Sequence, residues 1–486
     1  MPVLKSLRSA SFYIGREKEL QLLKPLLQKH TSSLIVFKGR RRVGKSRLAQ
    51  EFAKNHRFLK FSGLAPTEGT TPEIQRQEFM RQLSEQTDFP EVQVDDWGKA
   101  FSMVASQTKT GRVIILLDEI SWMAEGSPEF LPKLKNAWDL SFKDNPELIL
   151  ILCGSISSWI DQNILQSTGF VGRISLVLNL EPLTLKDSSV FIKKIAPNLS
   201  KIEQFQILSI TGGIPRYLEE ILPNTPAAES IHRLCFTPEG LLFQEFNDIF
   251  SDLFSRRSPT YQRILMALVD GKREFHRLCE SLELSKSGSI SEYLDDLIQA
   301  GFIKKELTWE IQSQKISRFG HYRISDNYTR FYLKFILPNQ ERIQSGLFKN
   351  QSLSALPNWE GIMGLQFENL VLQNRDLIWQ AAGISPNDIS IENPFFQRPT
   401  SKITGCQIDY LIQTQYNTLF PCEIKFSQNN PIGPSVINQM KEKLENLSLP
   451  KNFSYWPVLI HASEISPQVS AQNYFSKIID FSQFLT

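Results

Sequence analysis

One short stretch constrains this chain more than any other. Residues 36–46 read V-F-K-G-R-R-R-V-G-K-S and match the phosphate-binding loop (P-loop) pattern G-x-x-x-x-G-K-[ST]. Gly39 and Gly44 allow a tight turn, so that successive backbone N–H groups point at one phosphate. Lys45 brings a cation to the outer phosphates, and Ser46 offers a hydroxyl to Mg²⁺. We therefore expect ATP and Mg²⁺ here, with contacts from Gly39, Arg40, Arg41, Arg42, Val43, Gly44, Lys45, Ser46 and Arg47.

The segments on either side of this loop support the match. Residues 33–37 form an apolar run typical of a buried strand, and residues 45–53 have the spacing of a helix. The positive end of that helix dipole would face the same anion. The order of strand, loop and helix is the one that the motif requires, which a chance Gly/Lys loop would not share.

A second apolar run, residues 113–120, ends in two carboxylates. In a parallel sheet, an acid at the carboxyl end of a central strand faces the ligand crevice. We expect Asp118 to hold Mg²⁺ through water and Glu119 to polarise the attacking water as a general base. The alternative is a strand that leaves the sheet into solvent through this pair.

Length and composition limit the class of protein. A chain of 486 residues exceeds one ordinary core and predicts about three domains. No apolar run reaches the roughly 20 residues that span a bilayer, and the start of the chain has no apolar core of a signal peptide. The five cysteines are scattered without a C-x-x-C pair, which predicts a cytoplasmic protein without a zinc site. The net charge of +3 favours no particular partner.

Strand and helix patterns alternate from residue 34 to residue 178, which predicts an α/β fold with a parallel, helix-covered sheet. Ser155 follows another buried strand and could serve as a helix N-cap, as a polar sensor of the γ-phosphate, or as both. Arg173 precedes the last strand. It is either a surface arginine or an arginine finger supplied to a neighbouring subunit in a homo-oligomer. Residues 181–250 read as helical.

Residues 258–325 resemble a winged helix-turn-helix, with three helices followed by a hairpin. The predicted reading helix carries Glu292, Asp295 and Asp296, which repel phosphate. Favourable charges flank that helix at Lys286, Lys304, Lys305 and Arg318. DNA binding and a packing role between domains both remain open.

The last part of the chain carries a second group of charged residues. Asp409 lies in one predicted strand, and Glu423 and Lys425 lie two apart in the next, so that both point to the same face. Asp409 and Glu423 could bind a divalent metal, and Lys425 could position or deprotonate a water or steady developing charge. The alternative is an exposed Glu–Lys pair. The order of elements resembles the PD-(D/E)xK nuclease superfamily.

Taken together, these motifs resemble the archaeal-type P-loop ATPases, in which a core related to AAA+ and STAND ATPases leads into a winged helix and a nuclease-like domain. The resemblance implies that Ile14 and Gly15 lie near the adenine, and that Pro215 and Arg216, in a G-G-x-P turn, contact the nucleotide. It also implies an ATP-hydrolysing molecular switch. The expected domains are an ATPase core (1–180), a helical lid (181–255), a winged helix (256–345) and a nuclease-like α/β domain (346–486).

Two functions remain open from the sequence. In the first, the switch is coupled to a DNA-interacting winged helix and a metal-dependent nuclease, with catalytic roles for Lys45, Glu119, Arg173, Asp409, Glu423 and Lys425. In the second, the chain is an ATP-dependent regulator or signalling scaffold that binds DNA or protein, and its C-terminal domain is inert.

Overall fold

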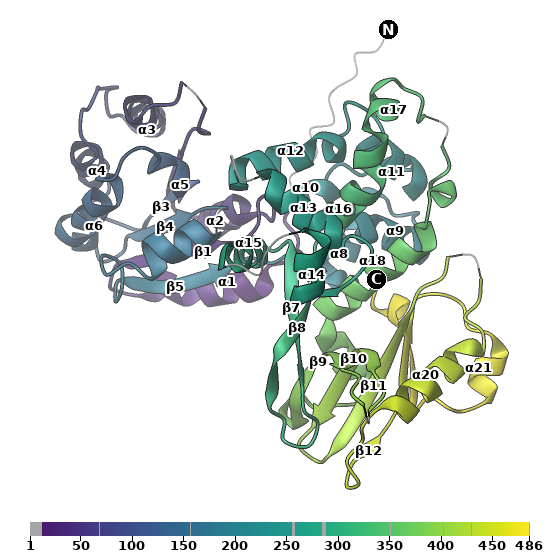
Figure 1. Ribbon diagram of the computed structural model, residues 1–486. Coiled ribbons are helices and arrows are strands. Elements are labelled where there is room, and N and C mark those ends of the chain that lie inside the picture. Colours follow the sequence, from purple (N-terminus) through teal and green to yellow (C-terminus); the bar gives the residue numbers. More distant parts are fainter. Residues whose placement is uncertain are drawn as a thin grey trace. The chain divides into compact units, whose positions relative to one another are not determined.

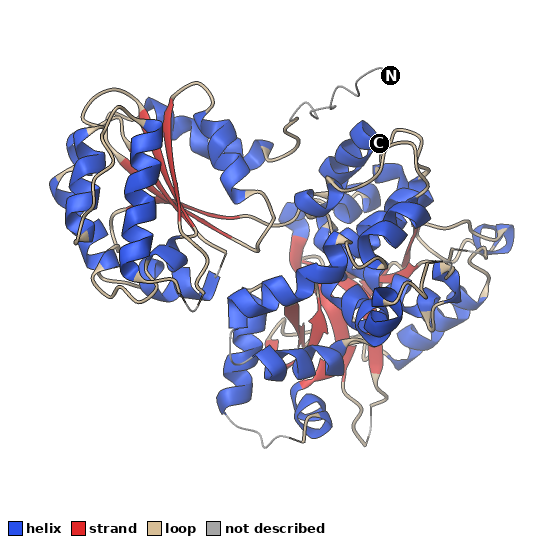
Figure 2. Cartoon of the chain, turned by 90° about the horizontal axis from the view of Figure 1, so that it is seen from above, coloured by secondary structure: helices blue, strands red, loops and turns tan. Residues whose placement is uncertain are grey.

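The computed structural model describes residues 12–67, 69–155, 157–254, 258–283, 288–349, 351–401, 403–428 and 430–485. The chain divides into two compact units, residues 1–183 and residues 184–486. In the described residues, the first unit contains one sheet and the second contains two (Figures 1 and 2). Lys286, which was expected to favour DNA, lies outside the described residues.

The first unit is built on a five-stranded parallel sheet in the order β2-β3-β4-β1-β5. Helices lie on both of its faces (Figure 2). Its strands are β1 (Ser33–Lys38), β2 (Arg57–Ser62), β3 (Val113–Asp118), β4 (Ile149–Cys153) and β5 (Ile174–Asn179). Its α-helices are α1 (Glu17–Leu23), α2 (Lys45–Ala53), α3 (Pro72–Gln86), α4 (Trp97–Ser106), α5 (Ile120–Met123), α6 (Phe130–Leu140) and α7 (Ser157–Ile160). The predicted parallel α/β sheet is confirmed.

The core of this unit lies between the sheet and the helices α3, α4 and α6. Strands β1, β3 and β4 are buried along almost their whole length, as expected of central strands covered on both faces. Aromatic rings of Phe79, Trp97, Phe101 and Phe130 stack or meet edge to face at centroid distances of 4.7–5.8 Å. This packing fixes the carboxyl ends of β1, β3 and β4, where the predicted site residues are found.

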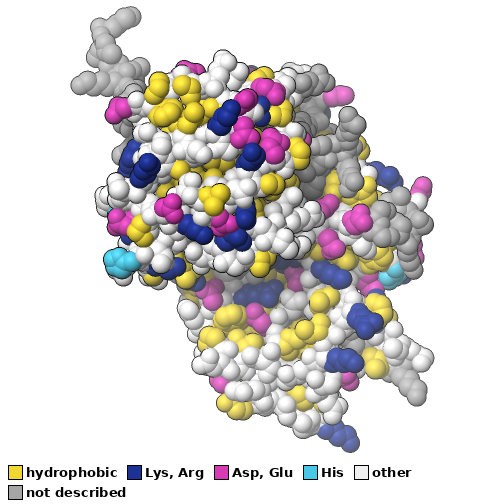
Figure 3. Space-filling model, turned by 90° about the vertical axis from the view of Figure 1, so that its left-hand side faces the viewer, with side chains coloured by type: hydrophobic (Ala, Val, Ile, Leu, Met, Phe, Trp, Pro, Cys, Tyr) yellow, Lys and Arg dark blue, Asp and Glu magenta, His cyan; other side chains and the backbone are white. Residues whose placement is uncertain are grey.

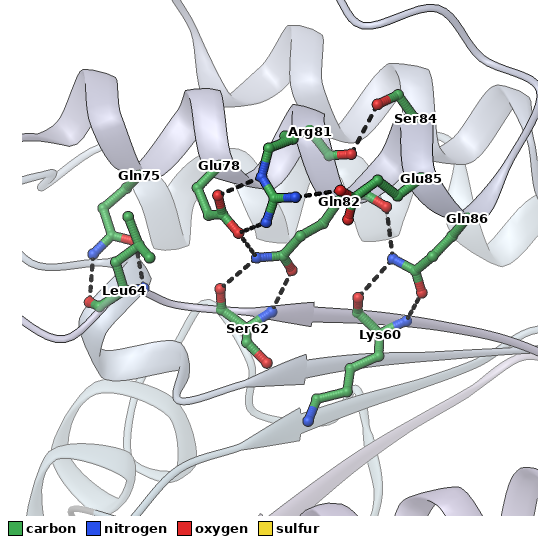
Figure 4. A network of polar contacts seen from close by, with 10 residues as sticks. All are labelled: Lys60, Ser62, Leu64, Gln75, Glu78, Arg81, Gln82, Ser84, Glu85 and Gln86. Carbon is green, nitrogen blue, oxygen red and sulfur yellow. Dashed lines mark hydrogen bonds and ion pairs between the residues drawn. The ribbon is translucent and has the colours of Figure 1, made fainter.

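Strand β2 is an edge strand, and helix α3 pairs with its backbone through a row of glutamine side chains (Figure 4). The Gln82 amide accepts from the N–H of Ser62 (2.7 Å) and donates to its carbonyl (3.0 Å). Gln86 makes the same pair of bonds with Lys60 (2.7 and 2.7 Å), and Gln75 makes it with Leu64 (3.0 and 2.8 Å). Alternate backbone groups of this edge therefore find partners without a further strand.

The second unit begins with helices and contains the three-helix and hairpin pattern predicted from the sequence. Its first helices are α8 (Leu185–Ile195), α9 (Lys201–Thr211), α10 (Pro215–Leu218), α11 (Ala227–Cys235) and α12 (Leu241–Phe254). There follow α13 (Ser258–Leu268), β6 (Arg273–Glu274), α14 (Phe275–Ser281), α15 (Gly288–Gln299), β7 (Ile303–Trp309) and β8 (Ile316–Ile324). The three strands form an antiparallel sheet in the order β6-β8-β7.

The rest of this unit is a mixed sheet with helices, of a type that the fold alone does not assign. The helices α16 (Asn327–Phe331), α17 (Gln340–Gln344), α18 (Trp359–Gln373) and α19 (Arg375–Ala382) precede it. The sheet order is β14-β13-β11-β10-β9, and β12 pairs with β11. Its elements are β9 (Ile389–Gln397), β10 (Cys406–Thr414), β11 (Thr418–Lys425), α20 (Ser435–Asn446), β12 (Ser454–Tyr455), β13 (Val458–His461), α21 (Pro467–Ala471) and β14 (Lys477–Asp480).

The β7–β8 hairpin packs against this mixed sheet, so the winged helix and the C-terminal region share one compact unit (Figure 1). Thr308 donates to the carbonyl of Phe396 (2.8 Å), and the Trp309 indole donates to the Gln413 amide oxygen (2.6 Å). These contacts show that the hairpin packs on the C-terminal sheet within one unit, while the choice between DNA binding and a packing role between domains stays open.

Candidate functional site

The P-loop turns sharply between β1 and α2. Gly39 has a φ of +137°, and a Cβ at this position would lie 2.4 Å from the carbonyl oxygen of Leu180, so a larger residue does not fit. Gly44 has a φ of +94° and caps the N-terminus of α2. Val43 between them is fully buried. The two positions therefore require glycine for different reasons. The backbone of Leu180 lies too close to Gly39 for a side chain, and Gly44 adopts a left-handed conformation.

Lys45 lies across the mouth of this loop. Its ammonium donates to the carbonyl oxygens of Gly39 (2.8 Å) and Arg40 (3.0 Å), and the residue is 6% exposed. Among the described residues no carboxylate pairs with Lys45. A buried cation that has only carbonyl dipoles as partners lacks a counter-ion, and this arrangement at a helix N-terminus fits a phosphate group.

Ser46 and Asp118 come together as the sequence predicts. The Ser46 hydroxyl donates to Oδ2 of Asp118 at 2.6 Å, and Asp118 is almost fully buried. Lys60 on β2 pairs with the same carboxylate oxygen at 3.0 Å, a contact that the sequence did not indicate. A hydroxyl and a carboxylate are ligand types that Mg²⁺ prefers, so these two residues fit this ion once it displaces the Lys60 ammonium from the shared oxygen. Their role in binding it stays a prediction.

Glu119 begins the short helix α5 in a left-handed conformation, with a φ of +51°. Its Oε2 accepts from the backbone N–H (3.1 Å) and the hydroxyl (2.9 Å) of Ser155, which follows β4. Glu119 and Ser155 are therefore in contact at the carboxyl ends of two neighbouring strands. The contact places Ser155 beside the predicted general base, which neither of its two expected roles specified.

Arg16 ties the segment before the loop to the loop itself. Its guanidinium donates to the carbonyl oxygens of Val43 (2.8 Å) and Glu181 (2.6 Å). Gly15, next to it, has a φ of +75° and is buried. Ile14 is half-buried. This places the predicted adenine-side residues Ile14 and Gly15 beside the P-loop. The sequence signal for the Arg16 contact was the G-R-E segment ahead of the loop.

The other predicted nucleotide contacts differ in their surroundings. The Arg41 guanidinium lies 5.9 Å from the centre of the Trp122 ring, and Arg40 is nearly buried. Arg42 has a φ of +68°, and Arg47 is exposed on α2. Pro215 is in the second unit, at the first position of α10, and its contact with the nucleotide stays a prediction.

Arg173 forms a bidentate ion pair within its own unit. Its Nε and Nη2 donate to the two carboxylate oxygens of Asp139 at 2.9 and 2.8 Å. The hydrogen bonds from Arg173, and next the one from Lys135, hold the pKa of Asp139 well below its usual range, although burial acts to raise it. An arginine finger acting on a neighbouring subunit would first have to leave Asp139, and this role stays a prediction.

The C-terminal charged residues also come together, with a lysine between them. Lys443 on α20 lies 2.5 Å from Oε2 of Glu423 and 3.4 Å from Oδ1 of Asp409. Lys425 lies 2.9 Å from Oε1 of Glu423, which is 1% exposed. Burial acts to lower the pKa of Lys443, but the Asp409 and Glu423 carboxylates outweigh it and raise that pKa, so the ammonium stays charged.

This arrangement does not fit a divalent metal ion as it stands. Both predicted ligands, Asp409 and Glu423, already share the Lys443 ammonium, and the other oxygen of Asp409 accepts from the N–H of Ile424 (3.0 Å). Burial raises the pKa of Glu368 on α18, and the nearby Asp409 carboxylate adds to that rise. Across the described ranges, no group of three or more His, Cys, Asp or Glu side chains could hold a metal ion.

Comparison with known proteins assigns two parts of the chain. Residues 13–221 match the family described as "ATPase domain predominantly from Archaea", and residues 258–305 match "Bacterial regulatory protein, arsR family". The chain carries an archaeal-type P-loop ATPase domain and an ArsR-type helix-turn-helix. The ATPase match extends through α8 and α9 and includes Pro215. Neither match reaches the C-terminal sheet, so these two family matches do not support the nuclease resemblance.

Individual relatives are more distant. An uncharacterized protein of Methanocaldococcus jannaschii is 26% identical over 360 residues, which are 74% of this chain and 76% of that protein. Among solved structures, a Walker-type ATPase of Pyrococcus abyssi is 19% identical, with 66% of this chain and 96% of that chain covered and a TM-score of 0.48. The ORC2 protein of Aeropyrum pernix is 14% identical, with 69% of this chain and 96% of that chain covered and a TM-score of 0.40.

In the described residues, no helix has the length and apolarity needed to cross a membrane.

Proposed function

We propose that this protein is an ATP-hydrolysing switch of the AAA+/STAND-related class whose nucleotide state controls its hold on DNA. The observation that carries the proposal is the buried Lys45 ammonium, which lies at the N-terminus of α2 with only carbonyl partners. A triphosphate in the P-loop would give this cation its counter-ion. Ser46 and Asp118, 2.6 Å apart, lie beside the same loop.

Each residue of this site has a role in the proposal. Ser46 and Asp118 would hold Mg²⁺, which neutralises charge on the phosphates when bound. Glu119 is the general base, and the two hydrogen bonds from Ser155 fix the direction of its carboxylate. Arg16 holds the loop through the Val43 carbonyl. Ile14, Gly15 and Pro215 contact the nucleotide, and Arg173 completes the site of a neighbouring subunit after leaving Asp139.

Hydrolysis tests the proposal directly. Purified wild-type protein should release phosphate from ATP in the presence of Mg²⁺. The Glu119→Gln variant keeps the size and the hydrogen-bonding ability of the side chain, so it should bind ATP as the wild type does and turn over at least about 100-fold more slowly. A Glu119→Gln variant with wild-type turnover would remove Glu119 from its role as the base.

The ArsR-type helix-turn-helix supports DNA as the partner. Duplex and single-stranded oligonucleotides should be retained by the wild type, with affinities that differ between the ATP-bound and ADP-bound states. Affinity that is independent of salt would argue against contacts with phosphate groups.

A second candidate activity is DNA cleavage by the C-terminal domain, which requires a metal ion to displace the Lys443 ammonium from Asp409 and Glu423. The convergence of Asp409, Glu423 and Lys425 favours it, and the Lys443 ammonium between the two carboxylates opposes it. DNA cleavage with Mg²⁺ or Mn²⁺ by the wild type, lost in a variant that combines Glu423→Ala with Lys425→Ala, would establish the nuclease. Equal activity in both proteins would leave the C-terminal domain as the inert part of a regulator.

A further inference from the structure

We infer that the hairpin side of the winged helix, together with Arg398 just after β9, binds an unpaired DNA strand, and that the exposed face of α15 does not. This inference rests on the proposed function, since it names the surface by which the protein would hold DNA. The strand's phosphates would lie on Lys305 and Arg318, and one base would stack on Phe319.

Charge argues against α15 as the element that meets phosphate. Its sequence, GSISEYLDDLIQ, holds three carboxylates and no lysine or arginine. Glu292 and Asp295 are exposed, and Asp296 accepts a hydrogen bond from the Tyr261 hydroxyl. A helix with this charge repels the DNA backbone, because non-specific affinity for DNA comes mainly from contacts between cations and phosphates.

A cavity of about 490 Å³ on the hairpin side has the opposite character. Its lining contains no carboxylate and includes the cations Lys305, Arg318 and Arg398, and α15 contributes only Ser291 to it. Across the described parts of the chain, neither Lys305 nor Arg318 forms an ion pair. Both are exposed, and the Lys305 ammonium lies 5.6 Å from the centre of the Tyr322 ring, on the neighbouring strand. Two cations without counter-ions beside a hollow suit phosphate groups.

The same cavity carries an aromatic platform. Phe319 is 56% exposed, and the Arg398 guanidinium lies 3.9 Å from the centre of its ring. Arg398 comes from the end of β9, and Glu274 on β6 holds it through both carboxylate oxygens. The C-terminal sheet therefore supplies one wall of this surface, and an oriented arginine supports the ring on which a base can stack.

A neighbouring cavity of about 620 Å³ extends the basic surface. Arg398 and His276 line both cavities, and the second one adds Lys272, Arg273 and Arg277. Its two carboxylates already have cationic partners, since Asp270 pairs with Lys334 and Glu274 with Arg398. A groove with successive cations and an exposed aromatic ring is the form in which proteins bind single strands, whose bases are free to stack.

Fluorescence anisotropy of the full-length protein with a labelled 12-nucleotide oligo-dT and with a duplex of equal length tests the inference over a salt series. We expect the single strand to bind more tightly than the duplex, and Phe319→Ala to weaken it about tenfold. Combining Lys305→Gln with Arg318→Gln should reduce the slope of log K against log salt by about 1.4, at about 0.7 for each phosphate contact. All of these side chains are exposed, so the variants should fold.

Two control variants define the outcome. Lys315→Gln removes an exposed lysine of the same hairpin that does not line the cavity, and Glu292→Gln removes an exposed acid of α15; both should bind the single strand as the wild type does. Wild-type binding that is unchanged in the Phe319 and Lys305/Arg318 variants overturns this surface while leaving DNA binding intact. Tighter binding to the duplex overturns the assignment of an unpaired strand, and a wild type that binds neither oligonucleotide overturns both the surface and the DNA-binding function.

Discussion

The row of glutamines on α3 (Gln75, Gln82 and Gln86) should stabilise the edge of the sheet, and its hydrogen bonds allow the size of the effect to be predicted. Gln82→Leu keeps a side chain of similar bulk and similar helix propensity, but it removes both hydrogen bonds to the backbone of Ser62 (2.7 and 3.0 Å). It also removes the bond to the Glu78 carboxylate (2.7 Å), which keeps its partner Arg81 and therefore adds little to the loss. Ser62 is half-buried at the end of the edge strand β2. Two hydrogen bonds with a net value of about 1 kcal/mol each predict a loss of about 2 kcal/mol from the unfolding free energy.

For a unit of this size, that loss corresponds to a fall of about 4–8 °C in the midpoint of its thermal unfolding. Hydrogen exchange resolved by mass spectrometry should also show faster exchange in the peptide that spans residues 57–64. Gln86→Leu is the matched control, because it removes the same pair of bonds from Lys60 at an exposed position, where water can replace them. We expect it to cost less than about 1 kcal/mol. If Gln82→Leu matches the wild type in both midpoint and exchange, the row does not stabilise the sheet edge.

Three further predictions concern other contacts. Ser155→Ala removes the hydroxyl bond to the Glu119 carboxylate and keeps the bond from the backbone N–H, so kcat for ATP should fall about fivefold while KM changes less than about twofold; an equal change in both would refute an orienting role. Burial, and after it the nearby positive charge of Lys272, lowers the pKa of His321 to about 4. Because the unfolded pKa is about 6.5, the unfolded chain binds more protons between these values, so the second unit should lose stability as pH falls from 6.5 to 4, and His321→Gln should flatten this part of the pH–stability curve. In the wild type the buried Arg323 guanidinium lies 2.8 Å from the Glu306 carboxylate. Glu306→Gln removes this anion and should lower the free energy of unfolding, measured in urea, by about 3–5 kcal/mol; a loss below about 1 kcal/mol would contradict the importance of the pair.

The sequence predicted most successfully where the signal is local. The helix over residues 45–53 has the predicted bounds, and β1 and β3 differ by one or two residues at their ends, because apolar strands and a glycine loop leave few alternatives. The convergence of Ser46 with Asp118 also followed from a general rule, since the carboxyl ends of parallel strands share one edge of the sheet.

Contacts that depend on tertiary packing were not visible in the sequence. Lys60 is an ordinary strand lysine until β2 pairs beside β3 and brings its ammonium to Asp118. Gln82 and Gln86 read as part of a polar helix, and only the position of α3 along the sheet edge gives them backbone partners. Lys443 lies 20 residues after Glu423 on a helix with a polar face, and no spacing rule connects the two.

The central claim is that the P-loop binds ATP through Lys45, and isothermal titration of ATP with Mg²⁺ into the wild type and the Lys45→Ala variant tests it most directly. Lys45→Ala removes the buried cation that meets the phosphates, and loss of a charge-assisted contact of about 2–3 kcal/mol predicts affinity about 30- to 150-fold weaker. Saturable binding by the wild type with this loss in the variant is the expected result. Equal affinity of the two proteins, or no binding by the wild type, would contradict the account.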